Sequence, residues 1–394
     1  MLISAISAFA VGKQHTYDVT VLAYTIFNAI LLIILFNSFN KYSNAKSYDM
    51  SNINLTKFHF VEKISIVSCS ISLVISLYVF YHLNLMVSAE MMTVEEYRYG
   101  DLVTATLNRI VGNHWLITLT RLFSPFGYIS LFYHFYYLLA KETKKAVVHL
   151  VLSFTIVSTG MMALSRSALI TYACVYATML YLYYPLIDTK IRKKMNFVIG
   201  SVAFIAATYF MTITTNRFEN RTTFYYATSK NKPIVNPNNY SKIYSVCDYG
   251  GQWQEYSTRA FEKYDPDYRF WGLYNSSGLI VHLISYINPN INKEIDDKLN
   301  KIIGHDRVLF QGVIVRLVFD FGIVGSILFI CLYAYFIKKI APKNGIVAVH
   351  KAILYPVILP FPLMFFSGNA FSGMELDIAV IYSVIVFSYL RVIK

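Results

Sequence analysis

The sequence predicts an all-α integral membrane protein, a polytopic bundle of about ten transmembrane helices with one large extracytoplasmic loop that contains short helices. Of its 394 residues, 56% are hydrophobic and only 14% are charged, whereas about a quarter of the residues in a soluble domain are charged. The apolar residues form long runs, and the basic residues form short clusters between the runs. So few charges cannot cover a soluble protein of this size, but they suit a chain surrounded by lipid.

The apolar runs approach the length of about 20 residues that a helix needs to cross a bilayer. They are Tyr17–Phe39, Val61–Met86, Trp115–Ala140, Ala146–Leu164, Ala168–Leu186, Asn196–Thr214, Val308–Ile337, Ala352–Phe366 and Met374–Val392. Met1–Val11 is apolar but short. Two alternatives therefore stay open for it, a shortened first span or a segment at the membrane interface.

The basic clusters predict the orientation of the chain. When Met1–Val11 is counted as a span, all of these clusters fall on one side of the membrane: Lys41, Lys46, Lys57, Lys141, Lys144, Lys145, Lys190, Arg192, Lys193, Lys194, Lys338, Lys339, Lys343, Lys351, Arg391 and Lys394. Short loops rich in Lys and Arg remain in the cytoplasm. We therefore expect the C-terminus to be cytoplasmic.

This orientation divides the chain into three parts. Residues 1–214 hold the N-terminal transmembrane helices with a small outer loop at 87–114, residues 215–307 form the large extracytoplasmic loop, and residues 308–394 hold the C-terminal transmembrane helices. The large loop is rich in Tyr and Trp, which argues against disorder. Within it, Leu273–Ile287 is largely apolar but short, and the segment after it has apolar residues at helical spacing.

Several function classes find no support in the sequence. The net charge is +13, but the basic residues are spread between the spans, so we expect no nucleic-acid binding. The four cysteines have neither a zinc spacing nor a disulfide framework. No sequence motif for a metal or a nucleotide cofactor is present, and we expect neither metal nor cofactor.

Three arginines provide the main chemical signal, because ionisable groups inside spans are costly and often functional. Arg121 and Arg316 lie about two turns into runs that enter from the outer side, and Arg166 lies at the outer end of a run. All three are thus within about 10 Å of the outer surface. A guanidinium matches phosphate geometry, so we predict a pyrophosphate site. The alternatives are snorkelling to lipid headgroups, or, for Arg316, pairing with Asp320 on the same helical face.

Other side chains of the large loop are candidates for contact with a sugar substrate. Trp253 and Trp271 could stack on sugar rings, although aromatic residues also gather at membrane interfaces without any ligand. His305, Asp265 and Asp267 are the preferred candidates for a general base that removes the proton of an acceptor hydroxyl. Each of them is alternatively a solvated loop charge.

Two stretches give the chain a resemblance to a known family. Met162–Ile170 contains Ser165, Arg166 and Ser167, and Asp320–Gly325 has the order acid, any residue, Gly, two residues, Gly. Both stretches, and the order of spans around a large outer loop, resemble the O-antigen polymerase (Wzy) family, the oligosaccharide repeat unit polymerases. The related O-antigen ligases carry a histidine where this chain has Gln311, which favours the polymerase.

The resemblance implies a bacterial enzyme of the cytoplasmic (inner) membrane. It would be a membrane glycosyltransferase without cofactor that polymerises oligosaccharide repeat units carried on undecaprenyl pyrophosphate, for O-antigen (lipopolysaccharide) or capsule. The family often works with a polysaccharide chain-length regulator. The alternatives are a ligase-like membrane glycosyltransferase, a flippase or transporter of lipid-linked oligosaccharide, and a membrane scaffold.

Overall fold

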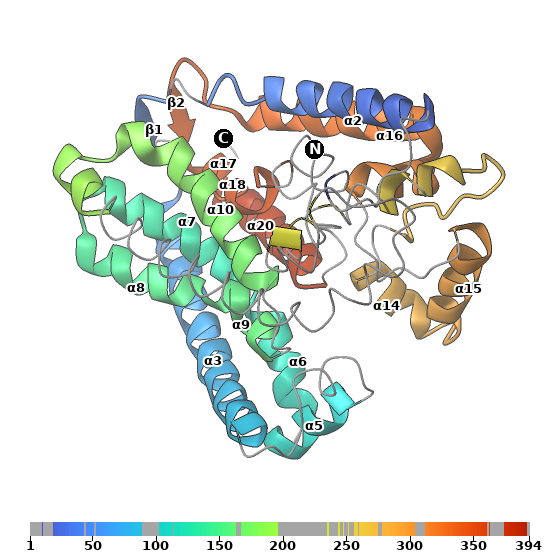
Figure 1. Cartoon of the computed structure of the whole chain (residues 1–394). Coiled ribbons are helices and arrows are strands. Elements are labelled where there is room, and N and C mark those ends of the chain that lie inside the picture. The colour runs from blue at the N-terminus through green and yellow to red at the C-terminus, as the bar shows by residue number, and fades with distance from the viewer. Residues whose placement is uncertain are drawn as a thin grey trace. The chain divides into compact units, whose positions relative to one another are not determined.

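The computed structural model is mostly helical (Figure 1). It divides into two compact units. It describes residues 10, 19–42, 45–50, 53–88, 102–112, 114–162, 167–195, 235, 243–244, 247, 251, 256–258, 260–274, 278–303, 312–360, 362 and 374–391. Unit 1 comprises Met1–Asn37, Thr189–Tyr335 and Met364–Ser372. Unit 2 comprises Ser38–Asp188, Phe336–Leu363 and Gly373–Lys394.

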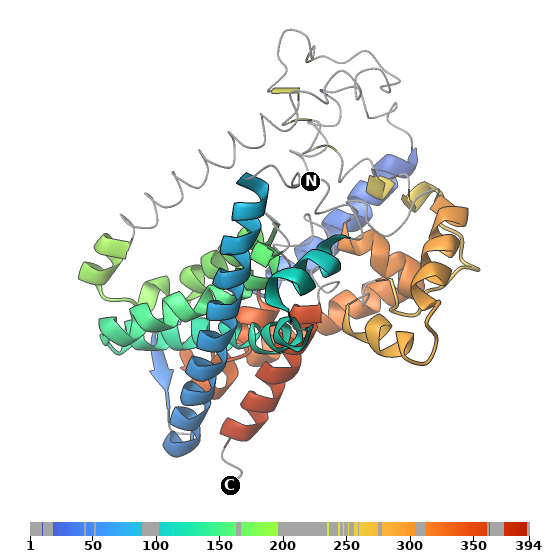
Figure 2. The ribbon, with the colours of Figure 1, turned by 90° about the horizontal axis from the view of Figure 1, so that it is seen from below.

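Unit 2 is built around α3 (Leu55–Ser88), which Figure 2 shows as one uninterrupted helix. The helices that pack on α3 include α5, α6, α7, α8, α9 and α20. The helices of this unit are α5 (Leu102–Val111), α6 (His114–Phe123), α7 (Phe126–Leu139), α8 (Thr143–Ser153), α9 (Thr155–Met162), α10 (Ser167–Tyr183), η1 (Tyr184–Leu186), α17 (Val349–Ala352), α18 (Tyr355–Ile358) and α20 (Met374–Leu390).

Two predicted single spans are each divided in the structure. The run Trp115–Ala140 forms α6 and α7, which meet at Ser124 and Pro125, because proline has no N–H to donate to the preceding turn. The run Ala146–Leu164 forms α8 and α9, which are separated at Phe154. The Thr155 hydroxyl lies 3.2 Å from the Ser124 carbonyl oxygen, so one side chain links the two breaks. The prediction of one continuous helix for each run was therefore wrong.

A short parallel sheet joins two distant segments of unit 2. β1 (Ser47–Asp49) pairs with β2 (Ile346–Ala348). A tight turn precedes β2, in which Asn344 (φ 53°) and Gly345 (φ 79°) both adopt positive φ. Asn and Gly tolerate this conformation better than other residues. The Lys46 N–H donates to the Gly345 carbonyl at 2.7 Å, which fixes the segment after α2 against the segment after α16.

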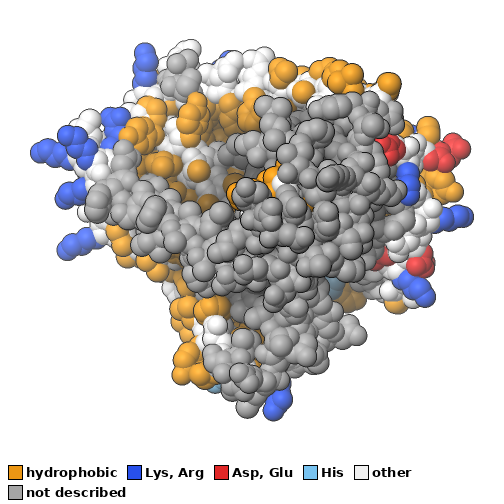
Figure 3. All heavy atoms as spheres, in the orientation of Figure 1, with side chains coloured by type: hydrophobic (Ala, Val, Ile, Leu, Met, Phe, Trp, Pro, Cys, Tyr) orange, Lys and Arg blue, Asp and Glu red, His pale blue; other side chains and the backbone are white. Residues whose placement is uncertain are grey.

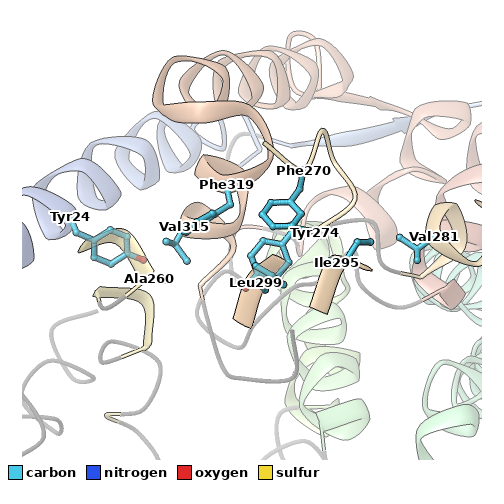
Figure 4. Close-up of a cluster of buried hydrophobic side chains, with 9 residues drawn as sticks. All are labelled: Tyr24, Ala260, Phe270, Tyr274, Val281, Ile295, Leu299, Val315 and Phe319. Atoms are coloured by element: carbon cyan, nitrogen blue, oxygen red, sulfur yellow. The ribbon is translucent and has the colours of Figure 1, made fainter. Parts of the chain in front are cut away.

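Unit 1 combines α2 (Val19–Asn37) with parts of the large loop and with α16 (Val313–Ile340) as far as Tyr335. The described helices of the loop include α14 (Leu279–Ser285) and α15 (Ile291–Ile303). A hydrophobic core connects these elements (Figure 4), and its buried members are Tyr24, Ala260, Phe270, Tyr274, Val281, Ile295, Leu299, Val315 and Phe319. The prediction of short helices within the segment 215–307 is confirmed by α14 and α15.

Three helical segments of the described residues are long and apolar enough to cross a membrane: Leu55–Met86, Ala168–Leu186 and Val313–Ile340. In the last of these, Val324, Leu328 and Leu332 are exposed at a spacing of four residues, as expected for a face in contact with lipid. α2 and α20 fall within the predicted runs Tyr17–Phe39 and Met374–Val392. The run Ala352–Phe366 contains the short helix α18, and the run Asn196–Thr214 lies outside the described residues.

Candidate functional site

α16 is interrupted at Gly322, whose backbone angles (φ 77°, ψ 176°) are not helical. This region of backbone space is almost restricted to glycine. At such a break the preceding carbonyl groups need partners from elsewhere in the chain. Here the Phe319 carbonyl accepts the N–H of Phe270 at 3.2 Å, and the Asp320 carbonyl accepts the N–H of Trp271 at 3.1 Å.

The side chain of Asp320 extends this contact. Its Oδ1 accepts two further backbone N–H groups, those of Gly272 and Tyr274, each at 3.0 Å. Asp320 is fully buried, and a buried carboxylate is stable only when hydrogen bonds replace its water. Residues 264–274, which we call the docked loop, are thus hydrogen-bonded to α16 through both the backbone and the side chain at the break.

The docked loop reverses direction at Trp271 and Gly272, which have φ values of 53° and 90°. A positive φ is ordinary for glycine but is an outlier for a bulky residue such as tryptophan. The Trp271 side chain is 77% exposed, so burial of the indole does not compensate for the backbone strain. Such outliers concentrate at functional positions, and Trp271 presents an aromatic face from a fixed backbone.

Arg269 contacts other residues of the docked loop and lies over the break in α16. Its Nη1 donates to the Tyr268 carbonyl at 3.1 Å, and its guanidinium carbon lies 5.3 Å from the centre of the Tyr264 ring. A Cβ on Gly322 would lie 2.9 Å from Arg269 Nη2. The absence of a side chain at Gly322 therefore gives Arg269 its position over α16. Lys298 of α15 adds a further contact, since its Nζ donates to the Arg269 carbonyl at 3.0 Å.

Arg316 lies in the first turn of α16 and is 6% exposed. Its guanidinium carbon lies 5.0 Å from the centre of the Tyr274 ring, a distance typical of a cation–π interaction. Because Tyr274 belongs to the docked loop, one contact joins the buried arginine to the loop that carries Trp271. We define the candidate site by these residues and by the Asp320 carboxylate that fixes the loop.

The predicted general bases on the docked loop have different surroundings. Asp265 Oδ1 accepts the N–H of Asp267 at 2.9 Å, which is a local turn contact. The side chain of Asp267 is exposed. Asp265 thus helps to shape the turn, and Asp267 is the more accessible carboxylate. His305 lies outside the described residues.

The structure brings only some of the predicted site residues together. Arg316, Asp265, Asp267 and Trp271 all belong to unit 1 and surround or form the docked loop. Arg121 is an exposed residue in the last turn of α6, in unit 2. Arg166 and Trp253 lie outside the described residues.

Residues that the sequence interpretation did not single out also build this site. Arg269, Tyr274 and Lys298 each make a contact that holds the docked loop. Their contacts depend on residues far away in the chain, so no local pattern identifies them. Gly322 did carry a signal, because a glycine inside an apolar helix often marks a kink or a close approach.

Comparison of the chain with protein-family models, with curated proteins and with solved structures finds no match in any of the three. The site must therefore be interpreted from its own chemistry. It joins a buried guanidinium, an exposed indole and an accessible carboxylate within one unit of the chain.

Proposed function

We propose that this protein polymerises oligosaccharide repeat units carried on undecaprenyl pyrophosphate. It would work on the outer face of a bacterial inner membrane as a multi-pass protein, with its large loop periplasmic and its C-terminus cytoplasmic. The observation that carries the proposal is the attachment of the docked loop to the helix of Arg316. The docked loop carries the exposed indole of Trp271, which suits a sugar ring. Through Tyr274 the same loop contacts Arg316, whose guanidinium suits a phosphate.

The proposed reaction is a glycosyl transfer between two lipid-linked glycans. A hydroxyl of the acceptor repeat attacks the anomeric carbon of the donor glycan and forms a new glycosidic bond. The bond between that carbon and the pyrophosphate oxygen breaks, and the pyrophosphate carrier leaves with the electron pair. The hydroxyl proton passes to a base, for which Asp267 is the accessible candidate on the docked loop.

Each residue of the site has a role in this proposal. Arg316 would stabilise the negative charge that grows on the leaving pyrophosphate, and preorganised cations are effective at this task. Trp271 would stack on a sugar ring of one glycan. Asp320 would act as a positioning residue, because its carboxylate is already committed to the N–H groups of the docked loop.

The test is the length profile of the surface glycan in a deletion strain that carries Arg316→Ala, Arg316→Lys or the control Lys293→Ala. Lys293 is an exposed cation of α15 in the same loop. We expect the wild-type and control genes to restore a ladder of long chains. Arg316→Ala should leave single repeats, and Arg316→Lys should restore shorter chains because lysine keeps the charge but loses the two-pronged contact.

Other outcomes would identify the alternative functions. If single repeats fail to reach the outer face in the deletion strain, a flippase is favoured. If long chains are made but stay on their lipid carrier, a ligase-like transferase is favoured. A normal ladder from normally expressed Arg316→Ala would contradict the proposed pyrophosphate site.

A further inference from the structure

Six lysines line one pocket in unit 2, in a different unit from the candidate site. The pocket has a volume of about 740 Å³ and lies where the C-terminal end of α16, the turn before β2 and the segment after α2 meet. Its lysines are Lys41, Lys46, Lys338, Lys339, Lys343 and Lys351. No acidic residue is among the described residues that line it. We call it the lysine pocket.

The fold holds these lysines together although they come from distant parts of the chain. Lys46 precedes β1 and Lys343 begins the turn before β2, so the pairing of the two strands brings both lysines to one place. The Lys351 ammonium donates to the Lys339 carbonyl at 3.2 Å, at the end of α16. A folded scaffold therefore defines the pocket, in contrast to a flexible basic tail.

The electrostatics of the lysine pocket favour an anion. Lys351 precedes the predicted span Ala352–Phe366, and its pKa is held below its usual range by partial burial and by the charges of Lys343, Arg391 and Lys339. A bound anion would relieve this repulsion between like charges. Asp49 of β1 is a nearby acid, and its charge acts on His350.

The position of the pocket limits the class of ligand. It lies at the end of a helix that is long and apolar enough to cross a membrane, on the side that the basic loops predict to be cytoplasmic. Basic pockets at this level suit the headgroups of anionic lipids. Figure 3 shows that basic side chains also gather at the left edge of the view, whereas patches of hydrophobic side chains lie toward the lower left, where α3 is seen in Figure 1.

We propose that the lysine pocket binds a phosphate-bearing anion with at least two negative charges. The phosphate groups can belong to the headgroup of an anionic lipid or to a soluble compound related to pyrophosphate. Lysine ammonium groups act as point charges toward phosphate, and a pocket of this volume accepts more than one phosphate group. This proposal does not depend on the glycosyl-transfer function.

The test compares the binding of two probes to the full-length protein in detergent. Cardiolipin, with phosphatidylcholine as the neutral reference, represents the lipid source and is followed by native mass spectrometry. Inorganic pyrophosphate represents the soluble source and is followed by calorimetry. The test variant is Lys46→Gln/Lys343→Gln. The matched control is Lys63→Gln/Lys144→Gln, which removes two exposed helical lysines of the same unit outside the pocket.

We expect at least one probe to bind the wild type and to bind the test variant roughly 30-fold more weakly at low salt. Loss for cardiolipin alone identifies a lipid headgroup, and loss for pyrophosphate alone identifies a soluble ligand. The conservative variant Lys46→Arg/Lys343→Arg should keep binding, which separates loss of charge from misfolding. Failure of both probes to bind the wild type, or an equal loss in the matched control, would overturn the proposal.

Discussion

The carboxylate of Asp320 accepts the backbone N–H groups of Gly272 and Tyr274, each at 3.0 Å. This contact replaces the water that a buried carboxylate would otherwise require. It also helps to determine where Trp271 lies, because Trp271 directly precedes Gly272 and its own N–H donates to the Asp320 carbonyl at 3.1 Å. The Asp320–Gly325 element of α16 therefore holds the docked loop in place, and this structural role can be tested without an activity assay.

Removal of the Asp320 carboxylate should destabilise the protein. Asp320→Ala removes this acceptor from the buried N–H of Tyr274 and from the part-buried N–H of Gly272, and the loss of an acceptor costs a buried N–H about 1–3 kcal/mol. We expect the free energy of unfolding in detergent to fall by about 2–5 kcal/mol and trypsin to cleave faster in the docked loop. The control Asp267→Ala changes an exposed side chain and should shift stability by less than about 0.5 kcal/mol. Equal stability of the two variants would show that Asp320 does not hold the loop.

Gly322→Ala should also destabilise the protein, because φ at this position is 77°. A backbone outlier of this kind costs a residue with a side chain about 1–3 kcal/mol. The new Cβ would also contact Arg269 Nη2, but the long arginine side chain can move away. The expected measurement is a lower unfolding temperature for Gly322→Ala.

The two causes are separated by measuring Gly322→Ala in an Arg269→Ala background. The backbone cost stays when the steric contact is removed, so we expect most of the destabilisation to remain. Full recovery in the double variant would assign the effect to the contact with Arg269 and would contradict the backbone explanation.

Trp271→Gly should separate stability from function. Glycine removes the strain of the positive φ at this position, so the free energy of unfolding should rise by about 0.5–1 kcal/mol. The same change removes the proposed sugar platform, so the surface glycan in the complemented deletion strain should become shorter.

The control for this prediction is Tyr286→Ala, which removes another exposed aromatic ring from the same unit. Its glycan profile should match the wild type. If the two variants give the same profile, Trp271 has no special contact with a sugar.

Gly127→Ala tests the close packing of the two divided spans in unit 2. A Cβ at Gly127 would overlap with Thr155 Oγ1 and would lie 2.9 Å from Ile156 Cγ1. Thr155 is buried and Ile156 is half-buried, and extra volume in a well-packed contact costs about 1–3 kcal/mol. We expect a lower unfolding temperature in detergent. An unchanged temperature would mean that α7 and α9 can move apart without a loss of stability.

Local sequence patterns account for much of the helical content but not for its interruptions. Ile295 and Leu299 lie at helical spacing, and both are buried members of the predicted helix α15. Pro125 inside the run Trp115–Ala140 offered a visible reason for a break. The break at Phe154 has no such residue. Next to it, Thr155 lies against Gly127 of α7 and donates to the Ser124 carbonyl, and no local pattern contains these contacts.

In the candidate site, too, the sequence predicts single residues but not the contacts between residues that lie far apart in the chain. The side chains of Arg316 and Trp271 are of types that stand out by chemistry, so the sequence predicts them as site residues. The acceptor role of Asp320 toward Gly272 and Tyr274 joins positions that are more than forty residues apart. Arg269 could not be predicted as a site residue, because a single basic residue in a polar loop is usually a solvated surface charge.

The pairing of β1 with β2 has a consequence for biosynthesis. Its two strands come from opposite ends of the chain, and at about 5–20 residues per second the ribosome needs roughly 15–60 s to make the intervening polypeptide. β1 is therefore made that long before its partner strand emerges. Closure of this small sheet is thus a late step of assembly, and a chain truncated before β2 would leave the edge of β1 open to other partners.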